Sequence, residues 1–249
     1  MSSHTINQWL EEHGLQLCAF RWGDLPKSVA ELTRQSLAGA TQVQPTRDSH
    51  LLLLANAGPQ FWRCLQSSSC KDNDDPVDTF SLELATEFQH TFLPASQFTQ
   101  LYPTPKGQPH IPLMRLGGLA GWNIPSPLGL GLHPEYGPWF AYRVAFLTNS
   151  KQLPNAFYKN PKAFKTTNIS TLRQSATLCA SCSAPCVTSC PAQAVTYGDT
   201  FHTERCYEHR LPESSKCHTH CFARTACPVG VEHQYDGEQL AHHMSMSWR

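Results

Sequence analysis

Long apolar runs and an excess of one charge are both missing from this sequence. The longest apolar stretches, such as Leu51–Ala55, are far shorter than the ~20 residues that a membrane span needs, so no membrane association is expected. Residues 1–17 lack the basic start and the apolar stretch of a signal peptide. Lys plus Arg and Asp plus Glu number 19 each, which disfavours a nucleic-acid partner. These absences together predict a cytoplasmic protein.

Internal repeats and low-complexity tracts are absent as well, and the composition is that of a chain with a packed core. The 249 residues, 40% of them hydrophobic, suffice for one large domain or two ordinary ones. Residues 1–150 are predicted to form an α+β domain from the spacing of their apolar residues. Helices are expected at Ile6–His13, Val29–Ala40 and Thr79–Thr91, and strands at Leu15–Phe20, Leu51–Ala55 and Tyr142–Leu147. Residues 94–109 are rich in proline and glycine, which predicts extended chain and no central strand, and residues 151–167 are predicted to be a connector.

Cysteine is the residue that this chain has in excess. Of 11 cysteines, three lie in the first 178 residues and eight in the last 71. A cytoplasmic chain has little use for disulfides, so this density indicates metal binding or redox chemistry. Charge is divided as well, because residues 1–150 carry nine basic and twelve acidic groups, whereas residues 151–249 carry ten and seven. A mild positive excess suits a segment that holds anionic clusters.

The eight cysteines form two runs that both end in Cys-Pro. The first run is Cys179-x2-Cys182-x3-Cys186-x3-Cys190-Pro191, and the second is Cys206 followed by Cys217-x3-Cys221-x5-Cys227-Pro228. In bacterial two-cluster ferredoxins the cysteine before proline ligates the other run's cluster. Three closely spaced thiolates on a short loop bind three corners of a cubic cluster, and a fourth thiolate from the same loop would strain it. We therefore predict two 4Fe–4S clusters, the first held by Cys179, Cys182, Cys186 and Cys227 and the second by Cys190, Cys206, Cys217 and Cys221.

Zinc binding and a purely structural role are the alternatives to iron–sulfur clusters for these cysteines. Zinc also accepts four cysteines, but zinc motifs normally come as two separated pairs. Eight buried free thiols would be a purely structural alternative. Seven of the 13 histidines lie from His202 onward, and they are expected to be surface or hydrogen-bonding residues. The three remaining cysteines, Cys18, Cys64 and Cys70, are expected to be ordinary small side chains.

The first domain contains one long motif, Leu132-His133-Pro134-Glu135-Tyr136-Gly137-Pro138-Trp139-Phe140-Ala141-Tyr142-Arg143, and two shorter segments, Asp75-Pro76-Val77-Asp78 and Pro109–Trp122. In these residues it resembles the cobalamin-trafficking chaperones of the cblC type, and the two shorter segments are the weaker matches. The resemblance implies a nitroreductase-like fold and a bound corrinoid. The corrinoid contacts that it implies are Ile111, Pro112, Leu113, Met114, Pro125, Ser126, Gly131, Leu132 and Tyr142. The alternative is that this segment is a well-packed turn and strand.

The order of the two parts is similar to that of epoxyqueuosine reductase and of reductive dehalogenases. In those enzymes a nitroreductase-like cobalamin-binding domain precedes two 4Fe–4S clusters. Leu119-Ala120-Gly121-Trp122 resembles a Gly-Leu-Gly-Trp stretch of epoxyqueuosine reductase, but His110–Arg115 holds no carboxylate where that family has its acidic proton donor. Reduction of a tRNA base is therefore not expected, and His110 and Tyr136 are the candidate acids for any such chemistry.

The predicted fold is thus a nitroreductase-like corrinoid-binding-type α+β domain over residues 1–165, followed by a bacterial ferredoxin-like two-cluster domain over residues 166–249. The predicted function is electron transfer from two 4Fe–4S clusters to a bound corrinoid, namely cobalamin, with loss of the cobalt's upper ligand. The expected partner is an electron donor such as a flavoprotein reductase. The alternative is a stand-alone electron carrier that binds no corrinoid. Catalytic residues are not assigned.

Overall fold

The structure, a computed structural model, describes residues 3–37, 44–150, 153–160, 178–198 and 201–246. The chain divides into two compact units. Unit 1 comprises residues 1–120 and 141–166, and unit 2 comprises residues 121–140 and 167–249. Residues 121–140, which the sequence placed with the first domain, therefore pack with the cysteine-rich segment.

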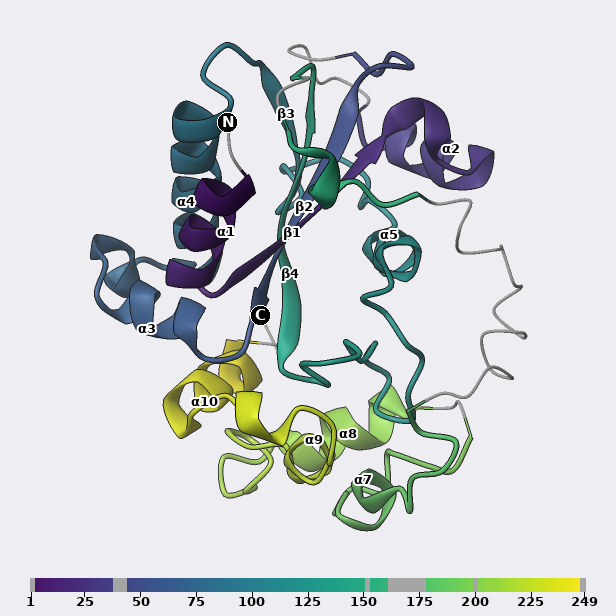
Figure 1. The fold of residues 1–249 in the computed structure, drawn as a ribbon. Coiled ribbons are helices and arrows are strands. Elements are labelled where there is room, and N and C mark those ends of the chain that lie inside the picture. Colours follow the sequence, from purple (N-terminus) through teal and green to yellow (C-terminus); the bar gives the residue numbers. More distant parts are fainter. Residues whose placement is uncertain (1–2, 38–43, 151–152, 161–177, 199–200, 247–249) are drawn as a thin grey trace. The chain divides into compact units, whose positions relative to one another are not determined.

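Unit 1 is built on a four-stranded sheet with the order β1-β2-β4-β3 (Figure 1). The strands are β1 (Leu15–Arg21), β2 (His50–Ala57), β3 (Phe98–Tyr102) and β4 (Phe140–Thr148). β1 pairs antiparallel with β2, Leu15 opposite Asn56, and β3 pairs antiparallel with β4. β3 lies at an edge of the sheet, which agrees with the prediction that the proline-rich segment holds no central strand.

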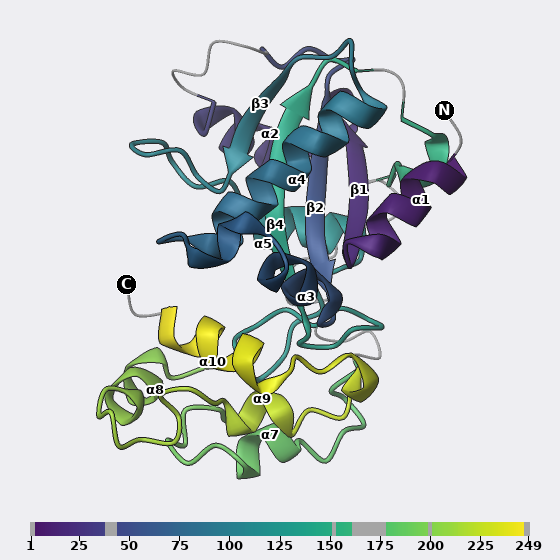
Figure 2. The same cartoon turned by 90° about the vertical axis from the view of Figure 1, so that its left-hand side faces the viewer.

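Helices cover both faces of this sheet. α1 (Ser3–Glu12) and α4 (Pro76–Phe92) lie on one face, and α2 (Lys27–Gln35) and α5 (Leu113–Ala120) lie on the other (Figures 1 and 2). α3 (Gln60–Gln66) follows β2. α4 starts with Pro76 in its first turn, and Phe80, Leu84 and Phe88 repeat every four residues on its buried side.

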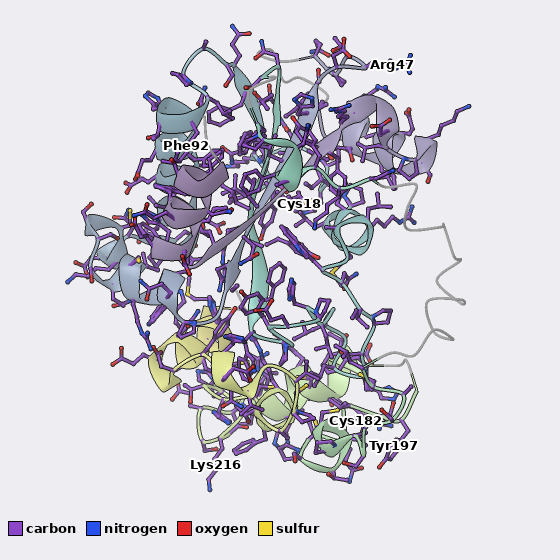
Figure 3. All side chains as sticks on the ribbon, in the orientation of Figure 1. Cys18, Arg47, Phe92, Cys182, Tyr197 and Lys216 are labelled. Carbon is purple, nitrogen blue, oxygen red and sulfur yellow. The ribbon has the colours of Figure 1, made fainter. Side chains whose placement is uncertain are left out.

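The core of unit 1 lies between the sheet and the α1/α4 layer. Side chains of β1 alternate between the two faces of the sheet, and every second one, from Leu15, Leu17 and Ala19, belongs to this core. Cys18 is fully buried and points from β1 toward the opposite face, the side on which α5 lies (Figure 3). The sheet is therefore buried on both faces, as the continuous burial of Leu51–Ala55 in β2 also indicates.

Two helices of unit 1 were not expected from the sequence. α5 occupies Leu113–Ala120, within the Pro109–Trp122 match, for which the sequence predicted no helix. Its two adjacent glycines lower helix propensity, and tertiary packing overrides this preference. α3 is short and had no clear apolar period. α2 ends at Gln35, before the predicted end at Ala40, which lies outside the described residues.

Unit 2 consists of short helices and loops around the cysteines. Its helices are α7 (Pro185–Thr188), α8 (Thr203–Arg210), α9 (Phe222–Thr225) and α10 (Gly237–Met246). Short 3₁₀ turns occur at η1 (Trp22–Asp24), η2 (Ser69–Asp72) and η3 (Asn155–Phe157) in unit 1 and at η4 (Val231–His233) in unit 2. Val195 pairs with Phe201 in an isolated antiparallel bridge.

No helix within the described part of the chain is both long enough and apolar enough to cross a membrane. Of the predicted connector at residues 151–167, only residues 153–160 are described. They form η3 and a bridge between Tyr158 and Ala19 of β1, and the rest of the connector lies outside the described residues.

Candidate functional site

The thiols of Cys179, Cys182, Cys186 and Cys227, here called the first cysteine set, come together in unit 2. Two of them, Cys179 and Cys182, lie in the turn before α7, Cys186 lies within α7, and Cys227 follows α9. Every pair of thiols in the set lies close enough for mutual electrostatic repulsion. Segments from both cysteine runs therefore converge on one place.

Burial and mutual repulsion make these thiols reluctant to ionise. Burial, followed by the neighbouring thiolates, raises the pKa of Cys179 to about 11. Burial also raises the pKa of Cys186 and of Cys227. Hydrogen bonds from backbone N–H groups oppose this rise, from Val187 at Cys186 and from Val229 at Cys227. Four such thiolates are stable together only beside a positive counter-charge, and bound metal supplies one.

A cavity of about 370 Å³ opens onto this set. All four cysteines of the first set line it, together with Pro125, Ser126 and Leu132 from the segment 121–140. Tyr197 lines the same cavity beside Cys182 (Figure 3). Its volume falls within the range of cofactor pockets, and its wall combines thiols with apolar groups.

The thiols of Cys190, Cys206, Cys217 and Cys221, here called the second cysteine set, form another group in unit 2. Cys206 lies in α8, Cys221 is the N-cap residue of α9, and Cys190 belongs by sequence to the first run. Every pair of this set interacts electrostatically. Cys186 and Cys227 of the first set share one apolar cluster with Cys190 and Cys221 of the second, so both sets belong to one core.

The donor chemistry of both sets fits iron–sulfur clusters. Zinc requires its ligand sulfur atoms about 2.3 Å from a single ion. Among the described residues, no three Cys, His, Asp or Glu side chains converge closely enough to hold one metal ion. A cubic cluster binds each thiolate at a different iron atom and so accepts a wider spacing.

The histidines near the cysteines make hydrogen bonds of their own. His220 Nε2 lies 3.2 Å from Thr225 Oγ1, and His218 Nδ1 lies 3.4 Å from the Arg210 carbonyl oxygen. Cys18, Cys64 and Cys70 lie in unit 1, and burial raises the pKa of each thiol. These positions agree with the packing and hydrogen-bonding roles expected for both groups of residues.

The residues implied as corrinoid contacts belong to both units. Those of unit 1 are Ile111, Pro112, Leu113, Met114 and Tyr142, and those of unit 2 are Pro125, Ser126, Gly131 and Leu132. In unit 1 the side chain of Met114 is 48% exposed, whereas Ile111 is buried. Tyr142 packs against Gly117 of α5, where a Cβ atom would lie 1.6 Å from Tyr142 Oη.

The unit 2 members of that set form a small hairpin. Ile124 and Leu132 exchange two backbone hydrogen bonds, and Ser126 Oγ donates to the Leu130 carbonyl oxygen at 2.6 Å. Leu132 is almost fully buried in the apolar cluster that contains the cysteines. This hairpin therefore supports the first cysteine set, a role that the sequence did not indicate.

The segment Leu132–Phe140 continues this support. Gly137 and Gly230 both have positive φ, and their backbones approach so closely that a Cβ atom at 137 would lie 2.1 Å from the Val229 carbonyl oxygen. Arg224 Nε donates to the Pro138 carbonyl oxygen at 3.1 Å. The guanidinium carbon also lies 5.0 Å from the Trp139 ring centre. The segment is thereby attached to the loop that carries Cys227.

The end of the same motif enters a polar cluster of unit 1. Arg143 Nε donates to Asn56 Oδ1 at 2.7 Å, and the guanidinium carbon lies 5.3 Å from the Phe61 ring centre. Burial raises the pKa of Asp78, and the Arg143 charge opposes this rise. Asp75-Pro76-Val77-Asp78 and the end of the long motif thus meet, and both have a packing role.

Sequence reasoning missed two arginines beside the second cysteine set. Arg210 makes a side-chain hydrogen bond to Cys206, and the Arg224 backbone N–H and charge both act on Cys221. The spacing held one usable signal, because Arg210 follows Cys206 by four residues and such positions share a helix face. Arg224 had no such signal.

Neither a protein-family model nor a curated relative matches this sequence. Among solved structures, an epoxyqueuosine reductase bound to a modified tRNA stem loop aligns over 96% of this chain and 68% of its own length, with a TM-score of 0.52 and 13% identity. An epoxyqueuosine reductase from Streptococcus thermophilus aligns over 92% of this chain and 66% of its own length, with a TM-score of 0.44 and 13% identity. A B12-trafficking CblC protein from C. elegans aligns over 69% of this chain and 83% of its own length, with a TM-score of 0.41 and 14% identity. The chain is thus similar in fold to the tRNA-bound reductase.

Proposed function

We propose that this protein is an iron–sulfur electron-transfer protein whose two 4Fe–4S clusters deliver electrons to a bound corrinoid. The observation that carries the proposal is the convergence of eight thiols of unit 2 into two sets of four. Bound clusters would supply single electrons, and reduction of a corrinoid's Co(III) by one electron weakens its bond to an upper ligand such as cyanide, which leaves as an anion.

The chain's own residues would hold and shield the clusters. The first set would bind one cluster and the second set the other, with Cys190 and Cys227 each serving the opposite run. Leu128 and Leu132 contribute apolar cover beside the cysteines. Such cover keeps water from the bound group and so influences its reduction potential. Backbone N–H groups of Val187, Arg224 and Val229 would stabilise the sulfur ligands.

The corrinoid part of the proposal rests on different support. The fold is similar to that of an epoxyqueuosine reductase over 96% of this chain. Met114, which the sequence motif implies as a corrinoid contact, exposes an apolar side chain that could lie on a corrin face. A flavoprotein reductase is the proposed source of electrons.

Anaerobic titration of the cluster-loaded protein with hydroxocobalamin tests this function. We expect a saturable change in the visible spectrum at about one corrinoid per chain, and a faster reduction of cobalt by dithionite than for a Cys190→Ala variant. Met114→Asp should weaken the affinity about tenfold, because it places a charge against an apolar ring. Val231→Asp is the matched control, since Val231 is similarly exposed, at 52%, and lies outside the implied contacts.

One observation favours the second candidate, a stand-alone electron carrier. Pro125, Ser126 and Leu132 line the cavity of the first cysteine set, so a corrinoid is not needed to explain their positions. A protein that holds iron and sulfide but shows no spectral change at micromolar hydroxocobalamin would have this function, and the corrinoid proposal would fall.

A further inference from the structure

Unit 1 holds a cavity of about 220 Å³ that no cysteine lines. This volume is below the ~300–1,000 Å³ of pockets for drug-sized ligands, so the cavity suits a small molecule. The residues that line it are Arg21, Asp48, His50, Leu153, Asn155 and Tyr158. All but the leucine are polar or charged, and such a wall favours a polar or charged occupant over an apolar one.

Backbone pairing sets the positions of the side chains at this cavity. Arg21 is the last residue of β1 and lies directly opposite His50, the first residue of β2, so both side chains share one face of the sheet. Tyr158 directly follows η3 and is fixed beside β1, because the Lys159 backbone N–H donates to the Ala19 carbonyl oxygen at 2.9 Å. The sheet and the segment after β4 therefore build the cavity together.

His50 leaves the Tyr158 hydroxyl hydrogen available to a ligand. His50 is 6% exposed, and its Nδ1 hydrogen-bonds to the Ser150 carbonyl oxygen. A carbonyl oxygen only accepts, so Nδ1 carries a proton and Tyr158 Oη, 3.1 Å away, cannot donate to it. Burial raises the pKa of Tyr158 against the lowering effect of the Arg21 charge, which keeps the hydroxyl protonated. Its hydrogen has no acceptor among the described residues.

Two opposite charges line the cavity without pairing. Arg21 and Asp48 are both exposed, and the part of the chain that the structure describes contains no ion pair between them. The Arg21 guanidinium carbon lies 5.3 Å from the Tyr158 ring centre, a cation–π contact that holds it at the wall. A guanidinium binds a carboxylate through two parallel hydrogen bonds, and the Asp48 carboxylate accepts hydrogen bonds from an ammonium group.

A ligand with a single charge would fit this wall poorly. Asp48 would repel a simple anion, and Arg21 would repel a simple cation. A molecule with both a carboxylate and an ammonium group gives each of these side chains a partner of opposite sign. Leu153, which is buried, supplies an apolar contact for the short hydrocarbon part of such a molecule.

We infer that this cavity binds a small ammonium–carboxylate zwitterion, the chemical class of the free α-amino acids. Arg21 and the Tyr158 hydroxyl would hold the carboxylate, and Asp48 would hold the ammonium group. The Asn155 amide offers a further donor and acceptor. The inference concerns unit 1 alone, so it depends on neither the clusters nor the corrinoid of the proposed function.

Saturation-transfer difference NMR of the cluster-loaded full chain with L-alanine, propionate and ethylamine tests the inference. Propionate lacks only the ammonium group of alanine, and ethylamine lacks only its carboxylate. We expect saturable binding of L-alanine at millimolar concentration. The affinity for each of the other two should be about tenfold weaker, because each leaves one charged side chain of the wall without its partner.

Substitutions at the two charges assign the contacts. Arg21→Gln should weaken the affinity for L-alanine about tenfold without weakening that for ethylamine. Asp48→Asn should weaken the affinity for L-alanine to a similar extent without weakening that for propionate. Arg47→Gln is the matched control, since Arg47 is also exposed and precedes Asp48 but does not line the cavity. Circular dichroism checks that each variant folds.

Several outcomes would overturn the inference. One is the absence of saturable L-alanine binding at millimolar concentration, and another is equal affinity for L-alanine and propionate, which would leave Asp48 without a role. Equal losses in Arg47→Gln and Arg21→Gln would place the contact outside the cavity. If a variant fails to fold, the comparison of the three probes on the wild type decides. None of these results bears on the hydroxocobalamin titration that tests the proposed function.

Discussion

Cys190 and Cys227 each interact with thiols of the other cysteine run. Cys190 follows α7 directly after three cysteines of the first set, yet the thiolates that it repels are Cys206, Cys217 and Cys221. Cys227 interacts with Cys179, Cys182 and Cys186. A short loop can direct three thiols at three corners of one cubic cluster. The fourth cysteine of the run then points away from that cluster, and the proline after it turns the chain away.

We therefore expect Cys190→Ala and Cys182→Ala to remove different clusters, although both residues belong to one run. Each should lose about half of the bound iron, because one of two four-iron clusters loses a ligand. Electron paramagnetic resonance of the reduced proteins should show that different signals remain. Cys64→Ala, in unit 1, is the control and should keep all the iron. If Cys190→Ala and Cys182→Ala left the same signal, the crossed assignment would be wrong.

At the scale of single elements, α5 shows how two neighbouring glycines can have unlike roles. Gly117 lies against Tyr142, so a Cβ atom there would lie 1.6 Å from Tyr142 Oη and 2.6 Å from its ring. Gly118, the next residue, has no atom within 4 Å of such a Cβ position. One glycine is thus needed for close packing of the helix on β4, and the other only weakens the helix.

Alanine at these two positions should therefore change stability in opposite directions. Gly118→Ala should raise the free energy of unfolding by ~0.5–1 kcal/mol, because alanine loses less backbone entropy in a helix. Gly117→Ala should lower it by ~1–3 kcal/mol, because the half-buried Tyr142 side chain must move away from the new methyl group. Urea denaturation followed by circular dichroism measures both changes. Two changes of the same sign would contradict the packing of Tyr142 on α5.

At the scale of the whole molecule, each unit has a core of a different kind. The core of unit 1 consists of aliphatic and aromatic side chains from the sheet and from helices such as α1 and α4. In unit 2 the apolar cluster around the cysteines has six buried members, Cys186 and Cys227 among them. So small a cluster gains little from apolar burial, and bound metal would then contribute much of its stability.

Removal of iron should consequently unfold unit 2 and leave unit 1 folded. Hydrogen exchange of the chelator-treated protein should show lost protection in α8 and α9 and unchanged protection in β1 and β2. The loaded protein, treated with the same buffer without chelator, is the control. Loss of protection in β2 to the same extent as in α9 would show that the units depend on one another and would contradict the expectation.

The sequence by itself determined the features that depend on local spacing. The strand at Leu15–Arg21 and the helix at Pro76–Phe92 follow from apolar periodicity, and the strand at His50–Ala57 follows from a continuous apolar run. The cysteine spacing likewise divides the eight cysteines into two runs. Only the tertiary structure decided that residues 121–140 pack with the cysteines, and that α5 forms despite its glycines. It also brought Arg224 into contact with Pro138, 86 residues earlier in the chain. These features depend on contacts between residues distant in sequence, and no local pattern records such contacts. The small size of Gly117, Gly137 and Gly230 allows the close approach of the chain at these contacts.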